Sequence, residues 1–163
     1  MSELQRLRAD HAAAVLEFEM ANRTYFATSI SDRGDEFFDH FAEHFEAWLS
    51  EQKSGAAAYH VLVDPDGAVL GRFNLILAGN GSAELGYRVA ERAAGRGVAT
   101  TWVRELCDLA TAEYGLQRIR AATSLRNVAS QRVLTKVGFA LLGPADPNHL
   151  GGKPGVWFEL ELG

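Results

Sequence analysis

The stretch from residue 57 to residue 90 constrains the fold most, because it has the pattern of three β-strands joined by tight turns. β-Favouring residues fill Ala57–Val63, and Asp64-Pro65-Asp66-Gly67 follows as a strong turn signal. Ala68–Leu77 is the expected hairpin partner. Asn80-Gly81 marks the next turn, and Ala83–Ala90 alternates apolar and polar side chains. The sequence therefore predicts three consecutive strands at the centre of the fold.

Helical patterns flank this block on both sides. Asp35–Glu51 carries aromatic side chains at helical spacing, and His11–Thr28 is mostly helical, with a turn-rich loop over Asn22–Arg33. Further helices are expected over Gly97–Tyr114 and Asn127–Val137. The remaining strands are expected over Glu3–Arg8, Gln117–Thr123, Phe139–Leu142 and Val156–Leu162. This order predicts a mixed α/β (α+β) protein with one central sheet and helices on both faces.

Length and charge narrow the class of protein. The 163 residues, 47% hydrophobic and 23% charged, suit a single domain over residues 1–163. The net charge of −5 argues against nucleic-acid or anionic-membrane partners. Met1–Asp10 has no apolar signal-peptide core, and no stretch reaches the length of a membrane span, so we expect a cytoplasmic location.

Cysteine and histidine usage gives no sign of a disulfide or a metal. Cys107 is the only cysteine and sits in an apolar helical pattern, so it is expected to be buried. His60 and His149 have no partner at metal-ligand spacing, so no metal is expected.

The first chemical motif is the glycine-rich turn Arg92-Ala93-Ala94-Gly95-Arg96-Gly97 between a predicted strand and a predicted helix. Two glycines let the backbone curl, so that the free N–H groups of the helix start face a bound pyrophosphate. Arg92 and Arg96 add positive charge. The turn lacks the Lys-Ser/Thr of a P-loop and is not G-x-G-x-x-G, which argues against an NTPase or a dehydrogenase. A simple strand-to-helix turn is the alternative.

The second motif is a short predicted helix that begins at Asn127. Asn127 and Ser130 share a face with Leu134 and Val137, directed toward the interior or a cleft, and Gly138 ends the helix. Asn127 also suits a purely structural role as the N-cap.

Together, in this order, the two motifs resemble the GNAT superfamily of acyl-CoA N-acyltransferases. The phosphate-binding motif of that family, Gln/Arg-x-x-Gly-x-Gly/Ala, is similar to Arg92-x-x-Gly95-x-Gly97. Gly86-Tyr87, Asn127-x-x-Ser130 and Gly138-Phe139 resemble the RimJ/RimL branch more narrowly. The resemblance is strongest over residues 64–142 and looser over the first sixty residues.

The resemblance implies a mostly antiparallel sheet in which two neighbouring parallel strands, Ala83–Ala90 and Gln117–Thr123, splay apart around acetyl-CoA as cosubstrate. It implies that main-chain groups of the first strand pair with the pantetheine arm, that an N–H near Val89 polarises the acetyl carbonyl, and that the glycine turn holds the pyrophosphate. The residues expected to bind acetyl-CoA are Tyr87, Val89, Ala90, Arg92, Gly95, Arg96, Gly97, Val98, Ala99, Thr100, Asn127 and Ser130.

The expected chemistry needs a base, because amines are largely protonated at neutral pH. Glu84, on the strand expected to flank the acetyl group, is the first candidate, and Glu19, on the first helix, is the alternative. Ser130 is the candidate donor to the leaving sulfur. Many relatives use a tyrosine for that role, and this helix has none. The resemblance implies direct transfer without an acyl-enzyme.

The expected function is therefore acetyl transfer from acetyl-CoA to a primary amine, with the N-terminal α-amine of a protein as the first choice. A small-molecule amine is the second possibility, and a non-catalytic CoA-binding module is the third. The chain is expected to be a monomer or a homodimer.

Overall fold

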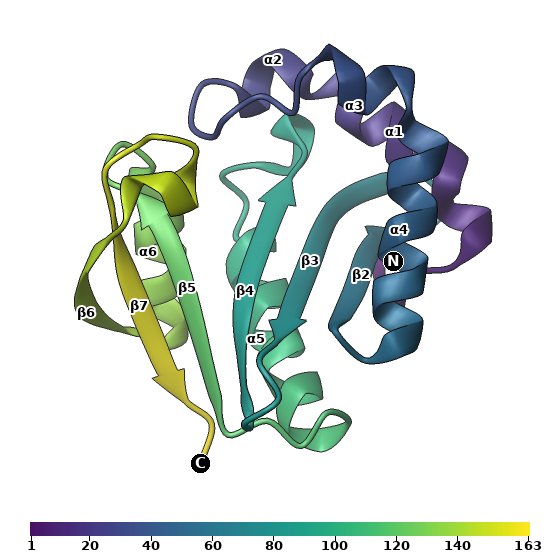
Figure 1. Ribbon diagram of the computed structural model, residues 1–163. Coiled ribbons are helices and arrows are strands. Elements are labelled where there is room, and N and C mark those ends of the chain that lie inside the picture. Colours follow the sequence, from purple (N-terminus) through teal and green to yellow (C-terminus); the bar gives the residue numbers. More distant parts are fainter.

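One seven-stranded sheet with helices on both faces organises the chain in the computed structural model, which describes residues 1–163 (Figure 1). The strands are β1 Glu3–Arg6, β2 Ala57–Val63, β3 Val69–Leu77, β4 Ser82–Val89, β5 Arg118–Ser124, β6 Ala140–Ala145 and β7 Gly155–Glu161. The helices are α1 Ala12–Ala21, α2 Arg23–Phe26, α3 Asp35–Asp39, α4 Phe41–Ser54, α5 Val98–Ala112 and α6 Val128–Val137. Short 3₁₀ turns occupy Ala9–His11, Glu91–Ala93 and Pro147–Leu150. The predicted fold class is confirmed.

The strand order is β1-β2-β3-β4-β5-β7-β6, and every neighbouring pair is antiparallel except β4 and β5. The parallel pair is joined only over Ser82–Glu84 and Arg118–Arg120. Beyond these residues the two strands diverge toward their C-terminal ends, as Figure 1 shows. The sheet is thus continuous at one end and open at the other, which confirms the expected splayed pair.

Two hydrophobic cores, one on each face, hold the helices against the sheet. Odd-numbered β4 residues such as Leu85 join α5 residues such as Leu106 in the core behind the sheet in Figure 1. The other core packs Phe18 of α1 and Phe45 of α4 against Val61 of β2. Successive side chains of a strand point to opposite faces of the sheet, so a sheet covered on both faces contributes side chains to two cores. No helix combines the length and the apolar character that crossing a bilayer requires.

The helical part of the first 56 residues is more broken than its pattern predicts. The single helix expected over Asp35–Glu51 is two helices, and His40 separates them with φ −119° and ψ 33°. The rings of Phe37 and Phe41 meet edge to face with centroids 5.7 Å apart. Both rings lie in one core. The His11–Thr28 pattern is likewise divided into α1 and α2.

Cys107 is buried on α5 with 7% exposure, as predicted, and burial raises the pKa of its thiol to about 12. The thiol is therefore protonated and unreactive at neutral pH.

His60 is a buried histidine of β2 that is held neutral. Its Nδ1 donates to the Phe73 carbonyl at 3.2 Å, and its Nε2 accepts from the Tyr114 hydroxyl at 2.9 Å. Burial, with a smaller contribution from Arg6, lowers the pKa of His60 to about 4 despite the hydrogen bond to Phe73.

We expect this histidine to make stability depend on pH. The unfolded chain takes up a proton near pH 6.5 and the folded chain only near pH 4, so the free energy of unfolding falls as pH drops through this window. Urea titrations at several pH values measure the effect, and His60→Gln should flatten the slope. An unchanged slope in that variant would show that His60 is not the group responsible.

Candidate active site

A cavity of about 340 Å³ opens where β4 and β5 diverge. Four segments line it: the loop after α2, the end of β4, the glycine turn with the start of α5, and one face of α6. Its lining includes Tyr25, Ser29, Ile30, Tyr87, Arg88, Val89, Gly95, Gly97, Val98, Ala99, Thr100, Asn127, Ser130, Arg132 and Lys136.

The glycine turn has the geometry that the sequence predicts. Gly95 and Gly97 have φ values of 74° and 76°, a left-handed conformation that costs any other residue about 1–2 kcal/mol. The turn lets α5 begin at Val98, with no side chain capping its first amides. These amides have no partner within the helix and carry the positive end of its dipole into the cavity.

The positive charge beside this turn comes from a different element than expected. Arg92 lies 3.5 Å from Asp64 and does not line the cavity, and the Arg96 side chain is exposed. Arg132 and Lys136 of α6 line the cavity instead. Sequence reasoning missed them, although their i, i+4 spacing places both on one helix face.

The main chain of β4 presents unpaired groups to the cavity. The bonds Ala78 N–H to Ser82 O and Ala90 N–H to Leu70 O assign the even-numbered β4 residues to pairing with β3. By antiparallel alternation, the N–H and C=O of Tyr87 and Val89 face the space that β5 leaves. Ala90 is different, since its carbonyl also accepts from Ala93 N–H. The Ala90 N–H is therefore already used, and the expected pairing of Ala90 with pantetheine, which only its carbonyl could make, stays a prediction.

Tyr87 and Ser130 meet across the gap, with their hydroxyl oxygens 3.1 Å apart. The Tyr87 ring stacks on Phe73, and burial raises the Tyr87 pKa to about 12, so the phenol keeps its proton. The side chain of Asn127 accepts from the Ser130 N–H at 3.2 Å and caps α6. The sequence predicted Ser130 as the donor to the leaving sulfur and showed no tyrosine on its helix. In the structure a tyrosine of β4, Tyr87, lies beside Ser130.

A second cavity, of about 400 Å³, lies along the diverging strands and reaches the loop between β6 and β7. It shares lining residues with the first cavity, namely Ser29, Ile30, Tyr87, Arg88, Asn127 and Ser130. The two cavities therefore lie side by side at the opening of the sheet, and Tyr87 and Ser130, where they meet, line both.

Glu84 lies next to His149, which lines the second cavity. The His149 Nε2 and a Glu84 carboxylate oxygen are 2.6 Å apart, and the His149 ring packs on Trp157 with centroids 4.9 Å apart. An Nε2–H that donates to Glu84 leaves Nδ1 free to accept a proton. No local sequence signal pairs these residues, since 65 positions separate them and only the topology brings them together.

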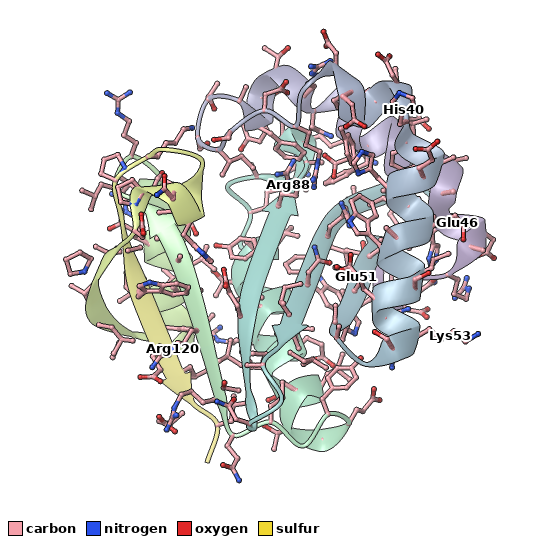
Figure 2. The ribbon with its side chains drawn as sticks, in the orientation of Figure 1. His40, Glu46, Glu51, Lys53, Arg88 and Arg120 are labelled. Carbon is pink, nitrogen blue, oxygen red and sulfur yellow. The ribbon has the colours of Figure 1, made fainter.

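Glu19, the alternative base, is fully buried in an ion cluster. Its carboxylate lies 3.0 Å from nitrogens of Arg33, Arg72 and Arg88. Burial favours the neutral acid, but Arg33, Arg88 and Arg72 together outweigh it and lower the pKa of Glu19. Both oxygens are occupied, so the geometry gives Glu19 a structural role rather than that of a base. Figure 2 shows Arg88 at the upper end of β4, beneath the first helices.

Comparisons with known proteins agree with this geometry. The Acetyltransferase (GNAT) domain family matches residues 3–140. The chain is 28% identical to the probable N-acetyltransferase YjcK of Bacillus subtilis, covering 96% of this chain and 88% of that protein. This chain belongs to the GNAT acetyltransferase family, and it is an N-acetyltransferase.

Solved structures show the same fold. The ribosomal-protein-S5-alanine acetyltransferase of Vibrio fischeri superposes with a TM-score of 0.88 at 21% identity, covering 98% of this chain and 92% of that one. RimJ of Mycobacterium smegmatis, in complex with CoA-disulfide, gives 0.85 at 22%, covering 98% and 81%. The spermidine N-acetyltransferase of Vibrio cholerae, with CoA and spermine, gives 0.81 at 18%, covering 99% and 95%. The predicted RimJ/RimL likeness is confirmed.

We expect Glu19→Gln to destabilise the fold, because three arginines then lose their buried counter-charge. Breaking such a buried pair costs about 3–5 kcal/mol. Because the pKa of Glu19 is lowered in the folded state, its stabilisation is complete above the ordinary value of 4.5 and is lost as pH falls through the lowered value. Urea denaturation at neutral and acidic pH measures both effects.

The matched control is Asp10→Asn, which removes an exposed ion pair with Arg8 and should leave the unfolding midpoint nearly unchanged. Equal stability of Glu19→Gln and the wild type would contradict the structural role.

Proposed function

We propose that this N-acetyltransferase takes its acetyl group from acetyl-CoA held between β4 and β5 and transfers it to the N-terminal α-amine of a polypeptide. The observation that supports this best is the pair of adjacent cavities at the opening of the sheet, which share Tyr87 and Ser130. One substrate enters from each side of the sheet, and the reacting atoms meet where the two cavities adjoin.

The residues present fit coenzyme A. The free amides at the start of α5, with Arg132 and Lys136 in the same cavity, suit the phosphates. The unpaired main-chain groups of Tyr87 and Val89 suit the two amides of the pantetheine arm, which pair in the manner of an added strand. In this placement a β4 N–H donates to the acetyl carbonyl oxygen and stabilises the negative charge that develops there. Loss of one such donor costs about 3–4 kcal/mol in comparable sites.

Glu84 and His149 supply the base in this proposal. His149 Nδ1 takes the proton that the attacking amine loses, directly or through one water, while Glu84 holds the ring by its Nε2–H. The new bond joins the amine nitrogen to the acetyl carbon, and the carbon–sulfur bond breaks. The sulfur leaves as the CoA thiolate, which accepts a hydrogen bond from the Ser130 hydroxyl beside Tyr87 and takes its proton from solvent.

The two other possibilities are weaker. A small amine gains support from the spermidine N-acetyltransferase among the similar structures. A non-catalytic module would have no use for the Glu84–His149 pair at the acceptor cavity. A single domain over residues 1–163, a cytoplasmic location and a monomeric or homodimeric state stay predictions from the sequence.

Substitution of the base pair tests the mechanism. We expect Glu84→Gln and His149→Gln each to lower kcat by about 10²–10⁴-fold, the usual contribution of a positioned acid or base. The assay follows free CoA thiol, with peptides, lysine derivatives and spermidine as acceptors, and calorimetry checks that acetyl-CoA still binds.

Glu46→Gln, on the outer face of α4 in Figure 2, is the matched control and should retain full activity. Full activity in both base variants would contradict the assigned base. Tight acetyl-CoA binding without turnover on any amine would instead favour the binding module.

A further inference from the structure

The wall of the second cavity carries positive charge and no carboxylate. Its charged lining consists of Arg33, Arg88, Lys153 and, when protonated, His149. No aspartate or glutamate side chain lines it. Glu84 lies outside the lining and is hydrogen-bonded to His149, which belongs to it. A polyamine acceptor would require the opposite arrangement, since its remaining ammonium groups would face like charges.

The ion cluster behind this wall has an excess of positive charge. Arg33, Arg72 and Arg88 share the single carboxylate of Glu19, so two positive charges lack a carboxylate of their own, although each guanidinium also stacks on an aromatic ring. Burial lowers the pKa of Arg72 and of Arg88 to about 10, so both stay charged at neutral pH. Arg33 and Arg88 are partly exposed in the cavity wall, so an anion bound in the cavity can pair with the excess positive charge.

Lys153 is a second, independent cation of the same wall. It is half-buried in the loop before β7 and has no acidic partner within 4.0 Å. Two further lining atoms are buried without a hydrogen-bond partner, Asn74 Oδ1 and Thr123 Oγ1. The Thr123 hydroxyl, on a residue only 4% exposed, suits a ligand oxygen, and the Asn74 carbonyl oxygen suits a ligand N–H.

The floor between these groups is open. Gly86 lies two residues from Glu84 and two from Arg88, about 7 Å in each direction at the rise of a strand. Nothing lies within 4 Å of where a Cβ on Gly86 would be, so an extended chain can rest there. An acceptor whose amine lies beside His149 can therefore extend over Gly86 toward Arg88, which lines the same cavity.

We propose that the acceptor carries a carboxylate close to the reacting amine, as an acidic side chain within the first three residues of a polypeptide N-terminus. Arg33, Arg88 and Lys153 bind this carboxylate, and the Thr123 hydroxyl donates to it. This inference rests on the proposed function and names its substrate class.

The test compares matched acceptors with the full-length enzyme and saturating acetyl-CoA. C-terminally amidated tetrapeptides Ala-Asp-Ala-Ala and Ala-Asn-Ala-Ala differ only in the charge, and Ala-Lys-Ala-Ala reverses it. Free glutamate with glutamine, and spermidine, form the small-molecule arms. We expect kcat/KM for the aspartyl peptide to exceed that for the asparaginyl peptide by about ten- to a hundredfold, the range of one charge-assisted hydrogen bond, mainly through KM.

Lys153→Gln and Arg33→Gln should each reduce that ratio, with little effect on the asparaginyl peptide. Lys53→Gln, far from the cavity on α4 in Figure 2, should leave the ratio unchanged. Arg33 belongs to the Glu19 cluster, whereas Lys153 makes no ion pair. Lys153→Gln is therefore expected to fold and still tests the inference if Arg33→Gln unfolds.

The outcomes separate this inference from the proposed function. Equal rates for the aspartyl and asparaginyl peptides, or a preference for the lysyl peptide or spermidine, would overturn the carboxylate inference while acetyl transfer stands. A preference for free glutamate over every peptide would retain the carboxylate but overturn the polypeptide. If no amine is acetylated, the proposed function itself fails.

Discussion

The separation of β4 from β5 after three paired residues is the constraint on which the site depends. Buried main-chain groups in proteins are almost always paired, so an internal strand that loses its neighbour halfway is unusual. Other contacts offset this lost pairing. β4 pairs with β3 along its length, and two cores fix the helices on either face of the sheet. What remains at the open end is a strand edge inside the protein, which an amide-containing ligand completes.

The neighbouring elements give this opening two different ends, each with its own cavity. On one side, the glycines at 95 and 97 allow α5 to start with free amides, and α6 adds two cations. On the other side, the Glu19 cluster ties α1 and the following loop to β3 and β4, and the loop before β7 brings His149 to Glu84. One end thus suits a diphosphate, and the other carries the base and the cationic wall that we assign to the acceptor.

The sequence predicts much of the fold, because strand alternation, turn residues and helical spacing are local signals. Ala57–Val63 is a strand with the predicted bounds, and the glycine turn has the predicted conformation. The break at His40 was not predictable, since no glycine or proline marks it in the sequence. The contacts of His149 with Glu84 and of the arginines with Glu19 were not predictable either, because side chains far apart in the sequence meet only once the sheet has formed.

Amide hydrogen exchange with and without acetyl-CoA tests the central claim most directly. The account predicts that acetyl-CoA slows exchange of the amides of Tyr87 and Val89 and of those from Val98 to Thr100, while amides that already pair with β3, such as Ala90, change little. Protection that appears elsewhere in the chain and leaves these β4 and α5 amides unchanged would contradict it.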